Sequence, residues 1–519
     1  MPVVSQADHG SSPPRIDIPR HYNAAVDLIG RNLAAGRGAK VAYLDDAGAT
    51  TYAQLAERVD RAANALRGLG IPRERRIAIA MLDSAARVAL FLGAIKAGIV
   101  PVALNTLLTP ADYEYQLNDS RARALFVSSA LLKQFEGMQA KCRDLKYVVT
   151  DTQLKELLAT ADPVADAAPT LRDDMCFWLY SSGSTGAPKG TVHRHSHLIL
   201  TAELYARPVL GIRESDVVFS AAKLFFAYGL GNAMTFPLAV GATTILKAER
   251  PTPDAVFKRL VEKKPTIFYG VPTLFAALLV NPAFPKKEQF SLRICTSAGE
   301  ALPAEIGKRW QERTGTELLD GIGSTEMLHI FLSNRPGDVR PGTTGKPVPG
   351  YELRLVDDQG NLVTRPGELG ELQISGPTSA IMYWNQREKT KNTFQGPWTR
   401  SGDKYSLDKD GYYAYGGRSD DMLKVSGIYV SPAEVEAALV SHQAVLEAAV
   451  VGAEDEQKLV KPKAFVVLKP GQSPSDSLKT ALQQHVKDKL APYKYPRWIE
   501  FLGELPKTAT GKIQRFKLR

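Results

Sequence analysis

The sequence contains few cysteines and no cysteine motif. Its three cysteines, Cys142, Cys176 and Cys295, lie far apart in 519 residues, without any C-x-x-C pair. This spacing argues against a disulfide framework and against a zinc knuckle. Residues 1–20 carry Pro, Asp and Ser where a signal peptide would need an apolar stretch. We therefore expect the protein to work in a reducing cytoplasm.

The sequence also lacks a basic stripe and an unbroken apolar run. The 65 basic and 55 acidic residues give a formal net charge of +10, but they are interspersed, which argues against nucleic-acid binding. A diffuse positive field suits small polyanionic ligands instead. Residues 224–246 hold no charge, yet Pro237 and several glycines interrupt them. We expect a buried loop, helix and strand there, and no membrane association.

The two most common nucleotide motifs are absent as well. Gly190 follows Lys189, where a Walker loop requires Ser or Thr, and no G-x-G-x-x-G fingerprint occurs. A different glycine-rich loop lies between a strand predicted at 175–180 and a helix predicted from about residue 197. Its free backbone amides and its lysine could hold triphosphate oxygens, although glycine and serine also mark ordinary flexible connections. The loop comprises Ser181, Ser182, Gly183, Ser184, Thr185, Gly186 and Lys189.

Strands and helices alternate through most of the chain. Apolar strands at 40–44, 76–81 and 99–104 alternate with helices at 52–69 and 84–97, and the scheme recurs from residue 266. This alternation predicts layered α/β units with largely parallel sheets, at whose carboxyl ends ligands gather. After about residue 337, short strands separated by Pro and Gly predict a small β subdomain.

A polar segment at 416–421 marks the expected domain boundary. Beyond it the pattern predicts a helix at 432–439, strands at 446–451 and 464–468, and a helix at 475–490. These elements suffice for a compact α+β domain. We predict a large N-terminal α/β domain over residues 1–419 and a small C-terminal α+β domain over residues 420–519.

The glycine-rich loop, Ser-Ser-Gly-Ser-Thr-Gly-Ala-Pro-Lys-Gly, closely resembles the signature loop of the adenylate-forming superfamily. This superfamily includes acyl-CoA and aryl-CoA ligases, luciferases and peptide-synthetase adenylation domains. The runs 226–229, 323–331 and 424–432 look most like those of bacterial benzoate-CoA ligases, and the motif positions show no departure. The resemblance, which covers about residues 23–519, implies ATP- and Mg²⁺-dependent conversion of an aryl carboxylate to an acyl-AMP and then to a coenzyme A thioester.

The run 320–326 taken alone would be a turn, but beside a phosphate loop it has a further meaning. Glu326 supplies the hard oxygen that Mg²⁺ accepts, and Thr325 can hydrogen-bond the α-phosphate. By resemblance, Lys512 is the catalytic lysine, whose charge would hold the carboxylate against the α-phosphate. The resemblance also implies a nucleotide site along the adenine and ribose. Besides the loop and Thr325, it contains Ser297, Ala298, Gly299, Glu300, Asp320, Gly321, Ile322, Asp403 and Arg418.

The acid pocket is expected in an aromatic segment. Phe226, Ala227, Tyr228 and Ile330 would form a flat apolar slot for a benzene ring, and no Arg, Asp or Glu is present there to hold an amino-acid head group. An aromatic core cluster without a ligand is the alternative. The predicted substrate-binding residues are Phe226, Ala227, Tyr228, Gly229, Gly323, His329, Ile330 and Lys512.

The resemblance further implies that the small domain is mobile. Asp420 is the expected hinge, and Lys424, Ser426 and Gly427 would face a coenzyme A tunnel. A homodimer is a family-based expectation, and acylation of Lys512 would remove its charge and switch the enzyme off. The alternating histidines 193, 195 and 197 have no carboxylate or cysteine neighbour in the sequence, so we expect no metal there.

Three alternatives stay open. The chain could be a stand-alone enzyme that loads an aryl group onto a carrier protein in trans, since only seven residues follow Lys512. It could be a ligase for a hydroxy-, amino- or fluorobenzoate, because one pocket residue can shift that choice. It could also be a nucleotide-binding regulatory protein without turnover.

Overall fold

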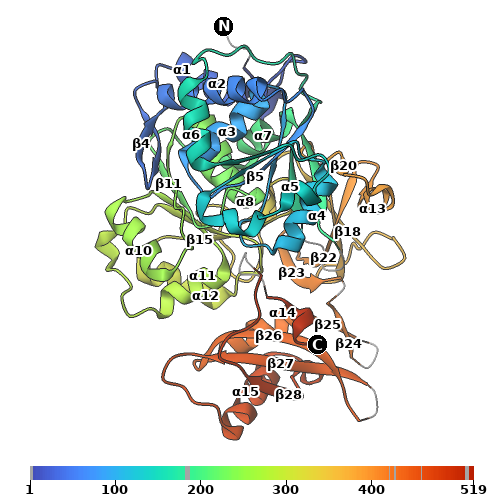
Figure 1. Ribbon diagram of the computed structural model, residues 1–519. Helices are drawn as coiled ribbons and strands as arrows, with labels where there is room; N and C mark the ends of the chain where they lie inside the picture. Colours follow the sequence, from blue (N-terminus) through green and yellow to red (C-terminus); the bar gives the residue numbers. More distant parts are fainter. Residues whose placement is uncertain (1–3, 182–186, 420, 426–427, 457–458, 509–512) are drawn as a thin grey trace.

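The computed structural model describes residues 4–181, 187–419, 421–425, 428–456, 459–508 and 513–519. A large body of α/β sheets and one smaller β-sheet precedes a small C-terminal unit of strands and helices, which Figure 1 shows below the body. This arrangement confirms the predicted fold class. The division at residue 420 stays a prediction, because Asp420 lies outside the described residues.

A seven-stranded sheet carries the strands that flank the glycine-rich loop. Its inner strands pair in parallel, whereas β10 pairs antiparallel with β9 and β20 at one edge. β5 is buried along its whole length, as expected for a parallel strand covered on both faces. The strand order is β20 (Met382–Tyr383), β10 (Lys189–Arg194), β9 (Met175–Ser181), β6 (Val100–Ala103), β5 (Arg76–Ala80), β7 (Ala124–Val127) and β8 (Tyr147–Thr150).

A nine-stranded sheet forms the second layer. The strands from β3 to β15 run parallel, and antiparallel strands close both edges. Its order is β17 (Lys346–Pro347), β16 (Ile330–Ser333), β15 (Leu318–Gly323), β14 (Ile294–Ser297), β13 (Ile267–Gly270), β11 (Val217–Ser220), β12 (Thr243–Ile245), β3 (Val41–Asp45) and β4 (Gly48–Thr51).

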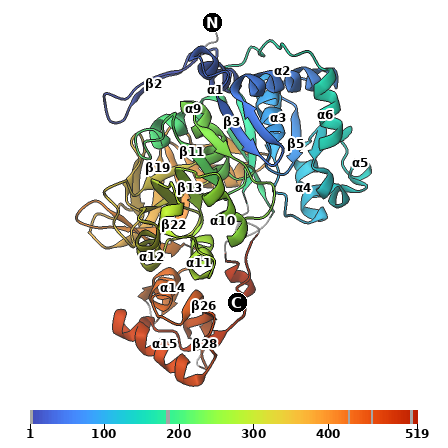
Figure 2. The same cartoon turned by 90° about the vertical axis from the view of Figure 1, so that its left-hand side faces the viewer.

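Several helices of the body begin at a residue whose side chain caps the first turn. α2 starts at Thr51, whose side chain accepts from the amide of Gln54 while the Gln54 side chain accepts from the amide of Thr51. α2 packs against α3 and α6, and Figure 2 shows the three helices beside β5. The longer helices are α1 (Ala24–Ala34), α2 (Tyr52–Gly68), α3 (Ala85–Lys96), α4 (Pro110–Ser120), α6 (Asp151–Thr160), α10 (Pro253–Glu262), α11 (Pro272–Val280) and α12 (Ala304–Thr314).

The uncharged run 224–246 forms buried elements, as predicted. It contains α8 (Ala227–Leu230), the π-helical turn η3 (Gly231–Thr235), α9 (Phe236–Val240) and β12. No helix among the described residues is long and apolar enough to cross a membrane. Other short helical elements are α5 (Met138–Lys141), α7 (His195–Thr201), the π-helical turn η2 (Ala202–Ala206) and α13 (Arg387–Thr393).

A five-stranded antiparallel sheet follows and leads to the C-terminal unit. Its strands are β18 (Glu352–Val356), β19 (Leu369–Ser375), β21 (Phe394–Gln395), β22 (Trp398–Leu407) and β23 (Tyr413–Arg418). The C-terminal unit has its own buried clusters, whose members all fall between residues 423 and 518. It consists of β24 (Leu423–Val425), β25 (Ile428–Val430), α14 (Pro432–Val440), β26 (Val445–Glu454), β27 (Val460–Leu468), α15 (Asp476–Lys489) and β28 (Trp498–Phe501).

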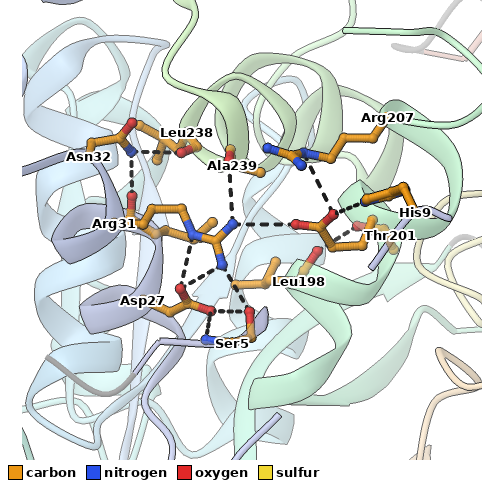
Figure 3. A network of polar contacts seen from close by, with 12 residues as sticks. Ser5, His9, Asp27, Arg31, Asn32, Leu198, Thr201, Arg207, Leu238 and Ala239 are labelled. Atoms are coloured by element: carbon orange, nitrogen blue, oxygen red, sulfur yellow. Dashed lines mark hydrogen bonds and ion pairs between the residues drawn. The ribbon is translucent and has the colours of Figure 1, made fainter. Parts of the chain in front are cut away.

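A buried polar network ties the N-terminal segment to the body (Figure 3). Arg31, on α1, donates to Oδ1 of Asp27 at 2.7 Å and to Oε1 of Glu203 at 3.3 Å. Ser5 donates to Asp27 at 2.7 Å, and His9 lies 2.8 Å from Glu203. Both residues belong to the segment that forms the hairpin of β1 (Gln6–Asp8) and β2 (Arg15–Asp17). The network therefore fixes this segment onto α1 and η2.

Candidate active site

The glycine-rich loop connects two antiparallel strands. Lys189, at the start of β10, pairs with Ser181, at the end of β9. The predicted passage from strand to helix is therefore wrong, because β10 stands between the loop and α7. Residues 189–194 pair with β9, and Thr191 and Val192 also pair with β20, which local sequence does not reveal. The loop residues 182–186 lie outside the described residues.

Lys189, Glu326 and Tyr383 form a polar cluster beside this loop. The Tyr383 hydroxyl donates to Oε1 of Glu326 at 2.7 Å, and Nζ of Lys189 lies 4.4 Å from the centre of the Tyr383 ring. Burial lowers the pKa of Lys189, while Glu326 opposes this effect. Among the described residues, no carboxylate lies within ion-pair distance of Lys189 and no donor reaches Oε2 of Glu326. Both charged groups thus keep capacity for a ligand.

Tyr383 was not among the residues predicted from the sequence. It lies 57 residues after Glu326, and it reaches the cluster because β20 pairs with β10. Burial and the neighbouring Glu326 raise the pKa of Tyr383, so its hydroxyl stays a donor. No signal of spacing or composition distinguishes this tyrosine, since its position depends on a long-range strand pair.

The alternating histidines separate into two environments. Nε2 of His193 lies 2.8 Å from the carbonyl oxygen of Thr325, and its Nδ1 lies 3.0 Å from Nδ1 of His197. His195 instead accepts from the amide of Ala24 at 3.2 Å. Burial lowers the pKa values of His193 and His195 to about 4. The neutral rings of His193 and His195 form hydrogen bonds with backbone atoms. His193 thereby fixes the position of the segment that carries Thr325 and Glu326.

Ser297, at the carboxyl end of β14, lies opposite Asp320, where the parallel pairing of β14 with β15 ends. Both side chains are buried, and neither Oγ of Ser297 nor Oδ1 of Asp320 has a hydrogen-bond partner within the described ranges. Burial raises the pKa of Asp320 to about 8, against the opposing effect of Thr344 and nearby amides. Gly299 follows with φ of 97°, which glycine adopts without steric penalty. Unpaired buried acceptors suit an amino-bearing ligand.

The other predicted nucleotide residues lie beside this strand edge and on the five-stranded sheet. Ala298 is buried, Glu300 is half-buried, and Gly321 and Ile322 belong to β15. Asp403 and Arg418 are cross-strand partners on β22 and β23, with 3.4 Å between Nη1 of Arg418 and Oδ1 of Asp403. The sheet thus brings together two residues that the sequence analysis assigned to the same ribose.

The predicted acid pocket has an aromatic wall formed by Tyr228, His329 and Phe236. The ring centroids of Tyr228 and His329 are 5.6 Å apart, and those of Phe236 and His329 are 4.5 Å apart. The Tyr228 hydroxyl hydrogen-bonds Oγ1 of Thr296 at 2.5 Å. Burial lowers the pKa of His329 to about 3, so its ring is neutral near pH 7. Phe236 and Thr296 were not among the predicted residues.

Two of the predicted glycines, Gly229 and Gly323, allow the backbone to pack closely beside this aromatic wall, because neither position has room for a Cβ. A Cβ on Gly229 would lie 2.1 Å from the carbonyl oxygen of Lys223, and one on Gly323 would lie 2.5 Å from the carbonyl oxygen of His329. Ile330 is buried at the start of β16, while Phe226 and Ala227 are half-buried against the main core. Tyr228, Gly323, His329 and Ile330 therefore lie close together, whereas Lys512 is outside the described residues.

Charged residues that were not among the predicted ones hold the backbone of the acid-pocket segment in place. The amide of Leu224 donates to Oδ1 of Asp83 at 3.2 Å. Nζ of Lys223 donates to the carbonyl oxygen of Glu249 at 2.9 Å and also to that of Lys247. Arg87 lies 3.3 Å from Asp83. The sequence did contain one signal for this contact, namely Asp83, an acidic residue shortly after the strand predicted at 76–81.

Several predicted positions cannot be placed. Lys512, Asp420, Ser426 and Gly427 lie outside the described residues, and the side chain of Lys424 is not described, although its backbone belongs to β24. Ile513, which directly follows Lys512, is described and donates its amide to Oε1 of Glu300 at 2.9 Å.

The carboxylate of Glu326 fits a magnesium ion. Mg²⁺ usually takes one or two protein carboxylates and completes its shell with water and phosphate oxygens. In the described part of the chain no three His, Cys, Asp or Glu side chains gather into a metal cage. A single carboxylate with a free oxygen, next to Lys189, therefore suits Mg²⁺ that arrives with a nucleotide.

The strand edges, the polar cluster and the aromatic wall agree with the sequence comparisons. Residues 31–384 match the family of AMP-binding enzymes, and residues 434–512 match the C-terminal domain of these enzymes. The chain belongs to the AMP-binding enzyme family.

Particular relatives are similar over nearly the whole length. The chain is 65% identical to a benzoate–CoA ligase of Thauera aromatica, with 100% of both chains covered. It is 58% identical to the crystal structure of a benzoate CoA ligase from Burkholderia xenovorans LB400, with a TM-score of 0.91 over 96% of this chain and 100% of that one. An anthranilate CoA ligase in complex with anthranoyl-AMP is 47% identical, with a TM-score of 0.94 over 97% of each chain.

Proposed function

We propose that the protein is a benzoate-CoA ligase. It joins benzoate to AMP at the expense of ATP, releases pyrophosphate, and transfers the benzoyl group to coenzyme A with release of AMP. The observation that carries this proposal is the 65% identity, over the full length of both chains, to a benzoate–CoA ligase. The aromatic wall of Tyr228 and His329 supports an aryl acid.

The nucleotide is held by the groups at the strand edges. Asp320 and Ser297 face the adenine, Asp403 and Arg418 hold the ribose, and Lys189 with the glycine-rich loop binds the phosphates. Thr325 reaches the α-phosphate. The cluster of Lys189, Tyr383 and Glu326 supports these roles, because it leaves one positive and one negative group beside the loop.

Activation of the acid is needed because a carboxylate is a poor acyl donor. Lys512 holds the carboxylate against the α-phosphate and offsets the repulsion between the two anions. Mg²⁺, held by Glu326, would neutralise phosphate charge. Tyr383 orients Glu326 through its hydrogen bond of 2.7 Å. The aryl ring is positioned by Tyr228, His329 and the residues around Gly229 and Gly323.

The two half-reactions need different surroundings, since coenzyme A must enter where Lys512 acts first. We assign the aryl acid and ATP site to residues 1–419 and the mobile lysine-bearing domain to residues 420–519, with Asp420 as hinge. Lys424, Ser426 and Gly427 then face the thiol. The separate hydrophobic clusters after residue 423 support a unit that moves as one body.

Incubation with benzoate, ATP, Mg²⁺ and free coenzyme A tests the function directly. Benzoyl-CoA and AMP are the expected products. An adenylate without benzoyl-CoA would favour an enzyme that loads a carrier protein, and binding of ATP without turnover would favour a regulatory protein. A panel of hydroxy-, amino- and fluorobenzoates decides the preferred acid, because the similarity to an anthranilate CoA ligase keeps a substituted benzoate as the second candidate.

Replacing Lys512 separates the half-reactions. Lys512→Ala should lower benzoate-dependent exchange of pyrophosphate into ATP by at least about 10³-fold, because the charge that offsets anion repulsion is lost. Attack of coenzyme A on supplied benzoyl-AMP should change far less. Equal losses in both assays would contradict the proposed alternation.

Three finer properties belong to the same proposal. The enzyme is a cytoplasmic homodimer, and acylation of Lys512 switches adenylation off by removing its charge. Sedimentation gives the oligomeric state. Fractionation gives the compartment. Chemical acylation with mass-spectrometric mapping should abolish pyrophosphate exchange in proportion to the modified Lys512.

A further inference from the structure

The loop that precedes Ile513 is closed at its base within the C-terminal unit. Lys507 and Ile513 form an antiparallel bridge, and the amide of Gln514 donates to the carbonyl oxygen of Pro506 at 2.7 Å. Nζ of Lys507 lies 2.7 Å from Oε1 of Glu447, on β26. These contacts attach both ends of the loop to the C-terminal sheet, so the base of the loop moves with that sheet.

Glu300 contacts this base from the large body. Its Oε1 accepts from the amide of Ile513 at 2.9 Å. Glu300 follows Gly299, whose φ of 97° turns the chain away from the end of β14. The half-buried carboxylate therefore bridges the nucleotide strand edge and the C-terminal unit, 213 residues apart in sequence.

Sequence adjacency makes this contact relevant to the chemistry. Successive Cα atoms are about 3.8 Å apart across a trans peptide, so holding the Ile513 amide fixes where the chain of the neighbouring Lys512 begins. A hydrogen bond to a charged acceptor corresponds to about a 10- to 100-fold population preference. Such a preference biases one orientation of a mobile domain without locking it.

We propose that Glu300 is a positioning residue that docks the Ile513 amide, and thereby the Lys512 loop, in the orientation that forms the adenylate. This role, which rests on the proposed function, differs from the adenine contact expected from the family resemblance. The carboxylate acts on the first half-reaction by positioning the loop. Its hydrogen bond to the amide of Ile513 breaks when the C-terminal unit turns to admit coenzyme A.

Glu300→Ala and Glu300→Gln test the role in the two half-reactions. Glu300→Ala should lower kcat of pyrophosphate exchange about 10- to 100-fold with KM for ATP nearly unchanged. Attack of coenzyme A on supplied benzoyl-AMP should stay within about twofold of the wild type. Glu300→Gln keeps an acceptor oxygen without the charge, so its loss should be smaller than that of Glu300→Ala.

Glu312→Ala is the matched control. Glu312 lies on α12, where it is exposed and 4.0 Å from Lys308, so both half-reactions should keep their wild-type rates. Equal losses in both half-reactions of the Glu300 variants, or a raised KM for ATP with unchanged kcat, would overturn the inference. Wild-type protein that forms no benzoyl-CoA would defeat the proposed function, whereas an active wild type with a fully active Glu300→Ala defeats only the role of Glu300.

Discussion

Two polar networks of this protein differ in how far their charges are paired. Arg31 is held between the carboxylates of Asp27 and Glu203, and Ser5, His9 and Arg207 complete that network (Figure 3). In the cluster beside the glycine-rich loop, Lys189 has no ion-pair partner in the described ranges, and the carboxylate of Glu326 receives one hydrogen bond, from Tyr383.

The difference separates a structural network from a ligand-binding one. Burial of a charge is unfavourable unless other groups compensate it, and in the first network the chain itself supplies the compensation. In the second cluster the compensation is incomplete, which suits charges that arrive with a bound nucleotide. Charge number alone does not distinguish the two; the pairing of each charged atom does.

Breaking the paired network should have the largest effect on stability. Arg31→Met would leave the buried carboxylate of Asp27 without its cation and would leave Glu203 with only His9 and the more exposed Arg207, so the free energy of unfolding should fall by about 3–5 kcal/mol. Urea unfolding measures this change, and kcat of the remaining folded enzyme should stay near the wild-type value. The control is Arg207→Met, since Arg207 is 39% exposed and its pair should contribute under about 1 kcal/mol. A loss below 1 kcal/mol in Arg31→Met would remove the contrast.

Breaking the open cluster should affect catalysis instead. Lys189→Met should change the free energy of unfolding by less than about 1 kcal/mol, because no ion pair is lost and a partly buried charge is removed. It should lower kcat/KM for ATP about 10- to 100-fold, the value of a hydrogen bond between charged groups. Pyrophosphate exchange at varied ATP gives this number. A large loss of stability with normal ATP kinetics would reverse the assignment.

The last prediction is a pH dependence from Asp320, whose effect per pH unit is smaller than the loss of stability expected in Arg31→Met. Its pKa of about 8 in the folded protein exceeds the ordinary value of 3.8, so the unfolded chain releases this proton first. Below about pH 4 the carboxyl is protonated in both states. As pH rises from about 4 to about 8, the free energy of unfolding falls by up to about 1.4 kcal/mol per pH unit from this group.

Asp320→Asn should lack the pH-dependent part of the unfolding free energy that comes from the Asp320 carboxyl. The difference in unfolding free energy between wild type and Asp320→Asn isolates it, because the buried histidines contribute equally to both proteins. Urea titrations of the nucleotide-free proteins at pH 5, 6, 7 and 8 supply the measurement. A difference independent of pH would show that Asp320 is ionised in the folded protein throughout this range.

Much of the fold was predictable because its periodicities are local. The helix predicted at 52–69 is α2, and the strand predicted at 76–81 is β5, since both bury a regular set of apolar side chains. The passage from the glycine-rich loop to α7 was wrong because β10 owes its existence to pairing with β9 and β20. A segment with partners far along the chain gives a weak local signal.

The amino-acid sequence by itself determined the family, the chemistry expected of each motif and the places where strands end, because these depend on residue types at short spacing. Only the tertiary structure decided that Tyr383 meets Glu326, that Asp83 anchors Leu224 and that Glu300 meets Ile513. Those contacts join residues 57 or more positions apart. Sheet pairing and domain packing bring such residues together, and neither leaves a periodic trace in the chain.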